Sequence, residues 1–234
     1  MTQNQPAPAT PTPVAPSEGP EQTTRTLLWY GAVAGPLYVV LGTAQAVFRD
    51  GFDIRQHALS LLSNGGLGWI QITNFLLTGV LTIIAATGVR RALRGAPGGT
   101  WAPRMIALYG VGLIAAGIFR ADPSFGFPPG TPDGQGAVSW HGMLHLVSGS
   151  IGFIGLIGAC LVMARRFTRA GRSGWAVYSR VTGIFFLAAF VGIASGAGNA
   201  LINITFTVAI AAGWLWLSAT TLRLRREITE ASAT

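Results

Sequence analysis

The sequence predicts an all-α integral membrane protein, a bundle of six transmembrane helices with both termini in the cytoplasm. Half of the 234 residues are apolar and only 10% are charged, whereas about a quarter are charged in ordinary soluble domains. The apolar residues form six runs that approach or exceed the length needed to cross ~30 Å of hydrocarbon. The arginines lie mostly in alternate connections between these runs, a pattern typical of multi-pass membrane proteins.

The six runs form one predicted transmembrane domain, residues 25–225. We expect helices over residues 26–48, 68–89, 102–119, 140–164, 175–197 and 201–222. The first run holds Gly31 and Gly35 four residues apart, a spacing that lets membrane helices approach closely. Only a few residues separate the last two runs, which predicts an antiparallel hairpin.

Both ends of the chain are predicted to be polar tails. Residues 1–24 contain six prolines among Ala, Thr and Gln and no apolar run, a composition that favours a disordered, partly polyproline-like segment. This segment also has no basic stretch followed by an apolar one, so it does not resemble a cleaved signal peptide. Residues 226–234 are predicted to form a short cytoplasmic C-terminal tail.

The distribution of arginine predicts the orientation. All sixteen basic residues are arginines, and thirteen lie before the first run, at the second and fourth connections, or after the last run. The remaining three, Arg49, Arg55 and Arg120, lie in the first and third connections. The positive-inside rule therefore places the thirteen in the cytoplasm. Arginines beside apolar runs also favour contact with anionic lipid headgroups and argue against nucleic-acid binding.

Polar side chains concentrate at the ends of the helices predicted to face outward. Such groups are costly near a membrane core unless they face one another or a wet cavity. All three histidines of the chain belong to this set. The candidate ligand-binding residues are Asp53, Arg55, His57, Asn74, Arg120, Asp122, His141, His145, Ser148 and Asn199.

Helical spacing predicts that several of these residues face the bundle interior. In the fourth helix, five residues spaced four, three, four and three apart share one face: His141, His145, Ser148, Gly152 and Gly155. Two other helices show similar spacing, at Asn74, Thr78 and Thr82, and at Ser195 and Asn199. We therefore expect three helices to turn a polar stripe inward at the same depth.

Two outer loops are expected to cover this region. In residues 49–67, the apolar residues at 54, 59, 61 and 62 predict a short interfacial or re-entrant helix that ends at Asn64 and the glycines after it. The loop at residues 120–133 contains four prolines, of which Pro123 ends the third helix. Phe125 and Phe127 are candidates for anchors in the membrane interface.

Three interpretations of the polar cluster remain open from these residues. It is purely structural, with Arg120 paired to Asp122 or Asp53; or it is a pocket in the extracytoplasmic leaflet that binds a lipid or small amphiphile. Alternatively, it is the site of a metal-dependent membrane hydrolase. For the hydrolase, the zinc ligands would come from His57, Asp122, His141 and His145, a chemically adequate set that leaves a position for an activated water. Of these three interpretations we favour the pocket that binds a lipid or small amphiphile, with the hydrolase as the first alternative. The sequence does not decide whether the protein is an enzyme, or what its oligomeric state is.

Three motifs carry a resemblance to a known family. They are the loop from Asp53 to Gly66 that leads into Ile70-Gln-Ile-Thr-Asn74-Phe; Phe119-Arg-Ala-Asp122-Pro123 with Gly126-Phe-Pro-Pro-Gly130; and Gly142-Met-Leu-His145. Over roughly residues 26–225 the chain resembles an uncharacterised prokaryotic six-helix family, domain of unknown function 998 (DUF998). This resemblance implies the fold, the topology and a prokaryotic cytoplasmic membrane, and it brings no established activity.

A looser likeness links the histidines to the transmembrane hydrolase superfamily that includes alkaline ceramidases. Those enzymes have seven helices with a histidine pair on the last one. Here there are six predicted helices, and the pair lies on the fourth, so the likeness is only an analogy.

Overall fold

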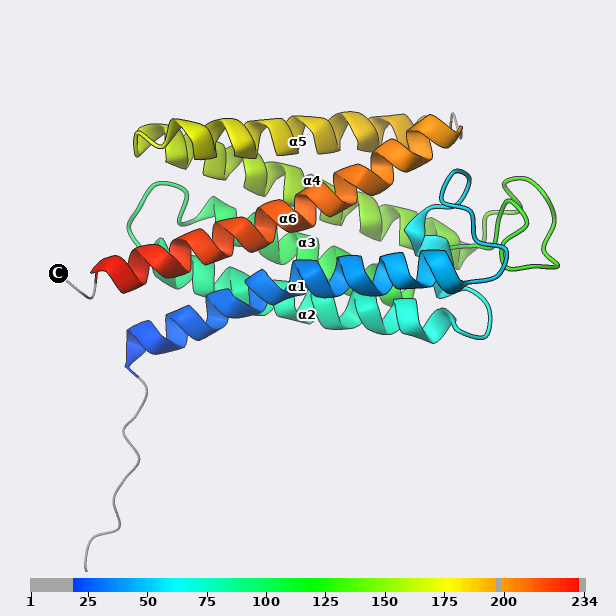
Figure 1. Ribbon diagram of the computed structural model, residues 1–234, viewed down its shortest axis with the longest axis horizontal. Coiled ribbons are helices and arrows are strands. Elements are labelled where there is room, and N and C mark those ends of the chain that lie inside the picture. Colours follow the sequence, from blue (N-terminus) through cyan, green and yellow to red (C-terminus); the bar gives the residue numbers. More distant parts are fainter. Residues whose placement is uncertain (1–18, 197–198, 232–234) are drawn as a thin grey trace, which may run out of the picture.

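The computed structural model describes residues 19–196 and 199–231 (Figure 1). The described elements are α1 (Pro20–Phe48), η1 (Leu59–Ser63), α2 (Gly68–Ala92), α3 (Trp101–Ile118), α4 (Trp140–Arg169), α5 (Ser173–Ala194) and α6 (Ala200–Ala231). Six of these helices are long and apolar enough to cross a membrane. The chain is therefore an all-helical, multi-pass membrane protein, as its sequence predicts.

Several helices extend beyond the predicted apolar runs. α1 begins at Pro20 and α6 ends at Ala231, and the 32 residues of α6 correspond to about 48 Å of helix, well above the ~30 Å of hydrocarbon. Hydropathy marks only the part of a helix that lipid surrounds, whereas backbone hydrogen bonding continues into polar sequence. Residues 20–24 and 226–231 are consequently helical rather than tail. Residues 1–18 of the predicted disordered tail lie outside the described residues.

The six long helices form a closed ring in sequence order. Each packs against its neighbours along the chain, and α1 also packs against α6. Residues Pro20 and Ala231 lie at one end of the bundle, and the loops 49–67 and 119–139 lie at the other (Figure 1). We call the first the terminal end and the second the capped end.

Glycine permits close contacts between helices, as two of the crossings illustrate. A Cβ atom at Gly35 would collide with the Ser218 hydroxyl and lie 2.8 Å from the Trp214 carbonyl oxygen, so α1 can approach α6 only because this side chain is absent. A Cβ atom at Gly112 would lie 2.6 Å from the Cα atom of Gly152, where α3 crosses α4. Small residues at helix contacts are the expected means of packing inside a membrane.

α4 and α5 are in close contact only over part of their length. Toward the terminal end, Gly183 of α5 faces Cys160 and Ile157 of α4. Nearer the capped end, the Phe153 ring of α4 packs against Phe190 at a centroid distance of 5.5 Å. Beyond these contacts the two helices diverge toward the capped end (Figure 1), and this divergence shapes the cavity described below.

Candidate functional site

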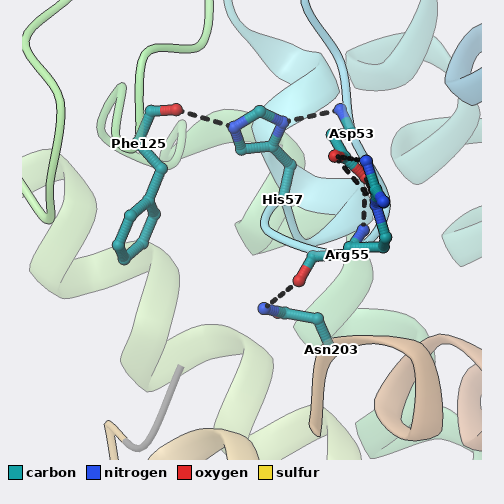
Figure 2. A network of polar contacts seen from close by, with 5 residues as sticks. All are labelled: Asp53, Arg55, His57, Phe125 and Asn203. Carbon is teal, nitrogen blue, oxygen red and sulfur yellow. Dashed lines mark hydrogen bonds and ion pairs between the residues drawn. The ribbon is translucent and has the colours of Figure 1, made fainter. Parts of the chain in front are cut away.

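His57 joins the two loops of the capped end. Its Nδ1 atom accepts a hydrogen bond from the Asp53 N–H (2.8 Å), and its Nε2 atom lies 2.9 Å from the Phe125 carbonyl oxygen (Figure 2). Because Nδ1 accepts and a carbonyl can only accept, the proton must lie on Nε2. The ring is 3% exposed. Both nitrogens are therefore occupied, and His57 acts as a bridge between loops.

Phe127 forms the centre of the packing between these loops. It is 0% exposed and contacts the rings of Phe52 and His57, while the Arg49 guanidinium lies 5.3 Å from the centroid of its ring. Arg49 also donates hydrogen bonds to carbonyl oxygens of the first loop. The prediction of a membrane anchor at Phe127 is thus wrong, because the first loop folds over the ring.

Asp53 and Arg55 form an ion pair within one turn, with 2.8 Å between the Arg55 Nη2 and Asp53 Oδ2 atoms. Hydrogen bonds from the Arg55 side chain and backbone lower the pKa of the Asp53 carboxyl to about 2. The pair faces water, where such bridges contribute little stability. The Arg55 carbonyl oxygen accepts a hydrogen bond from the Asn203 side chain at 3.2 Å (Figure 2), which ties the first loop to α6.

Asp122 fixes the start of α4. Its carboxylate accepts hydrogen bonds from the Ser139 backbone N–H (2.7 Å) and hydroxyl (2.6 Å), and the Ser139 Oγ in turn accepts from the Gly142 N–H (3.1 Å). A carboxylate at this position also interacts favourably with the positive end of the helix dipole. Since Asp53 pairs with Arg55, the predicted pairing of Arg120 with either aspartate is wrong within the described residues, and Arg120 is exposed.

Replacing Asp122 by alanine is expected to loosen the beginning of α4. The variant loses two hydrogen bonds to Ser139 and the favourable charge, so it should be less stable by roughly 1–2 kcal/mol. Thermal unfolding of the purified protein measures this, and Asp133→Ala, which changes an exposed aspartate of the same loop, is the matched control. Equal melting temperatures for the two variants would show that Asp122 does not hold the helix.

His145 is the buried histidine of the helix bundle, at 7% exposure. Its Nδ1 atom lies 3.0 Å from the Ala116 carbonyl oxygen and 2.8 Å from that of Phe119. Both are carbonyls at the end of α3, where a helix leaves its last acceptors unpaired. Because neither oxygen can donate, Nδ1 carries a proton. Burial among apolar groups favours the uncharged ring, whose Nε2 atom is a hydrogen-bond acceptor.

The predicted polar stripe of α4 faces inward only in part. His145, Gly152 and Gly155 are buried and Ser148 is half-buried, whereas His141 is exposed with its ring beside Trp140. His141 lies in the first turn of α4, one turn before His145. The inward face therefore begins at His145.

The four predicted zinc ligands do not come together. His57 lies in the first loop with both ring nitrogens bonded, Asp122 holds Ser139, and His141 points outward. Among the described residues, no group of three His, Cys, Asp or Glu side chains is arranged to hold a metal ion. Helical spacing predicted that His141 and His145 share a face of α4. It carried no information about the hydrogen bonds that hold His57 and Asp122 elsewhere.

Asn74 belongs to a buried amide cluster with Gln45 and Gln71. The Gln71 Oε1 atom accepts hydrogen bonds from Gln45 (2.9 Å) and Asn74 (3.4 Å), and Asn74 also donates to the Tyr38 carbonyl oxygen. Three side-chain atoms of the cluster, one on each residue, are buried without a partner: Gln45 Oε1, Gln71 Nε2 and Asn74 Oδ1.

The polar stripe of α2 faces inward, as predicted, because Asn74, Thr78 and Thr82 are all fully buried. The stripe predicted on the fifth helix is wrong. α5 ends at Ala194, so Ser195 and Asn199 do not share a helix, and both are exposed. Asn199 instead accepts a hydrogen bond from the Ile202 N–H at the start of α6.

A cavity of about 310 Å³ lies inside the ring, in the half nearer the capped end. Residues of all six long helices and of the η1 segment line it, mostly with apolar groups. In the described part of the chain, its polar lining side chains are all uncharged: Tyr38, Ser60, Tyr109, His145 and Ser150. Of the ten candidate residues, His145 alone lines this cavity. The two tyrosines were not among the predicted site residues, because their position inside apolar runs is the only signal that the sequence carries for them.

Aromatic rings form the deep wall of the cavity. Trp214 is fully buried and packs against Tyr38 and Tyr109 at centroid distances of 5.0 and 5.2 Å. Phe153 packs against Phe206 at 5.5 Å. These contacts separate the cavity from the terminal end of the bundle.

A family model described as Protein of unknown function (DUF998) matches residues 32–223. The chain belongs to the DUF998 family. No curated protein and no solved structure matched the chain. Membership confirms the resemblance carried by the loop and helix motifs, and for this DUF998 chain the candidate site is the cavity between the helices rather than the loops above it.

Proposed function

We propose that this DUF998 protein binds a lipid or a small amphiphile in the central cavity, within the extracytoplasmic leaflet of a prokaryotic cytoplasmic membrane. The cavity carries this proposal, because it has the size and the largely apolar lining of a small-molecule site. His145 supplies a buried hydrogen-bonding atom at its edge. The loops of the capped end lie above it.

The distribution of charge supports this orientation. Thirteen arginines lie at or near the terminal end, against three at the capped end, so the positive-inside rule favours cytoplasmic termini. All four aspartates, at positions 50, 53, 122 and 133, belong to the capped end. The cavity is then on the extracytoplasmic side.

The depth of the lining residues supports an amphiphilic ligand. His145 is five residues from the start of α4, about 8 Å along the helix, near the level of lipid headgroups. Phe153 is a further eight residues, or about 12 Å, toward the membrane centre. His145 therefore lies near the membrane interface and the aromatic wall lies nearer the hydrocarbon. An amphiphile in the same leaflet has its polar group and its apolar chain at these two depths.

Mass spectrometry of the molecules that co-purify with the protein tests this function. We expect one lipid class to be enriched over its share in the surrounding membrane, and Gly149→Leu, which adds a side chain at the cavity wall, to remove the enrichment. Gly149→Ala is the matched control, since a Cβ atom there meets nothing nearer than 3.9 Å.

Ser150→Leu also places a larger side chain in the cavity lining, and it serves as a second variant in case Gly149→Leu does not fold. A wild-type lipid profile identical to the bulk membrane would contradict the proposal. So would enrichment that persists in a folded variant with a filled cavity.

A further inference from the structure

We propose, resting on the function above, that the ligand is an uncharged amphiphile whose hydroxyl group donates a hydrogen bond to the Nε2 atom of His145, and that it enters sideways between α4 and α5. Three features lead to this proposal: the fixed orientation and tautomer of His145, the absence of charge from the described lining of the cavity, and the divergence of the two helices.

The orientation of His145 selects a hydrogen-bond donor. Two carbonyl oxygens of α3 hold its Nδ1 atom at 3.0 and 2.8 Å, so the neutral ring presents Nε2 as an acceptor. Among the described residues, no hydrogen bond reaches Nε2, and His145 lines the cavity. A ligand hydroxyl can donate to this atom, whereas an ether or ester oxygen cannot.

The lining of the cavity excludes charged headgroups. The lining side chains in the described part of the chain include no arginine, aspartate or glutamate. A phosphate or carboxylate placed among them would lose its hydration without gaining a counterion, which is strongly unfavourable. The charged residues of the capped end have other partners or face water, as the Asp53–Arg55 pair does. The ligand is therefore neutral in the part that enters.

The side between α4 and α5 offers the way in. η1 lies over the cavity, where Leu59 and Ser60 line it, and the aromatic wall closes the deep side. Between α4 and α5, however, the lining includes Leu146 and Ala194, both of which are exposed. These two helices diverge on this side (Figure 1), so a molecule in the outer leaflet can reach the cavity without passing through water.

Binding of three twelve-carbon probes to the full-length protein in detergent micelles tests the choice of headgroup: dodecanol, dodecyl methyl ether and dodecanoate. We expect radiolabelled dodecanol to bind saturably, and the other two probes to compete with it about tenfold less well. The ether loses the hydrogen bond to His145, and dodecanoate would bury a charge. His145→Phe should weaken dodecanol by about tenfold and leave the ether unchanged. His141→Phe, one turn away but exposed, should change neither.

Because His145→Phe also removes the bonds to α3, the ratio of alcohol to ether in the wild-type protein is the deciding measurement. Equal binding of the ether would overturn the hydroxyl assignment, and tighter binding of dodecanoate would overturn the neutral headgroup. In both cases the proposed binding function would stand. If none of the three probes binds, this inference fails, whereas the proposed function still depends on which lipids co-purify with the protein.

Bulk placed at the side opening tests the route. Ala194→Trp should slow both uptake and release of labelled dodecanol and change its affinity little. Val181→Trp, at an exposed position of α5 nearer the terminal end, should leave both rates unchanged. Wild-type rates in Ala194→Trp would overturn entry between α4 and α5.

Discussion

Replacing Gly112 by valine is expected to yield little or no folded protein. A Cβ atom at this position would lie 2.6 Å from the Gly152 Cα atom and 2.8 Å from the Ser148 carbonyl oxygen. Both are backbone atoms of α4, which cannot turn aside as a flexible side chain can. Overpacking of an ordinary core costs about 1–3 kcal/mol, and a collision between two helix backbones should exceed that range, because α3 and α4 must separate along their length.

The monodisperse yield in detergent and the melting temperature measure this effect. Gly149→Val is the matched control, because the same change on α4 meets no atom nearer than 3.9 Å. We expect near-normal yield for the control and aggregation or loss for Gly112→Val. Similar behaviour of the two variants would contradict the close crossing of α3 and α4.

Replacing His57 by leucine is expected to detach the two loops of the capped end from each other. Leucine fills a similar space but removes the acceptor for the Asp53 N–H and the donor to the Phe125 carbonyl oxygen. Each buried backbone group left without a partner costs about 1–3 kcal/mol, so the loops should open more often. Hydrogen exchange should therefore rise in residues 49–67 and also in residues 119–139.

The simultaneous rise in both loops is the specific sign of this bridge. Gln56→Ala changes an exposed neighbour and should leave exchange unaltered in both segments. An increase confined to residues 49–67 would mean that His57 supports only its own loop.

Much of the fold was accessible from the sequence because its determinants are local. A run of about twenty mainly apolar residues needs lipid around it. The arginines concentrate in every second connection between such runs. Both signals survive without knowledge of tertiary contacts. The start of α1 and the end of α6 were less accessible, since helical hydrogen bonding continues through polar sequence where hydropathy is low.

The candidate site was less accessible, because the partners of its polar residues are backbone atoms. His57, Asp122 and His145 form hydrogen bonds with backbone groups of Phe125, Ser139, Ala116 and Phe119, which lie 17 or more residues away. Backbone groups have no signature in the residue types. The sequence placed most candidate residues at the end of the bundle nearer to which the cavity lies. It could not show that His145 is the one candidate residue that lines the cavity, or that Tyr38 and Tyr109 line it as well.

If a ligand enters between α4 and α5 as proposed, it arrives by diffusion within the bilayer and competes with neighbouring lipids for the opening. Occupancy then depends on the mole fraction of the ligand in the bilayer and hardly on the volume of buffer outside. Dilution or dialysis against water should then leave the site filled. Excess detergent, which dilutes the lipids themselves, should empty the site. Occupancy should therefore be measured as a function of the detergent-to-protein ratio.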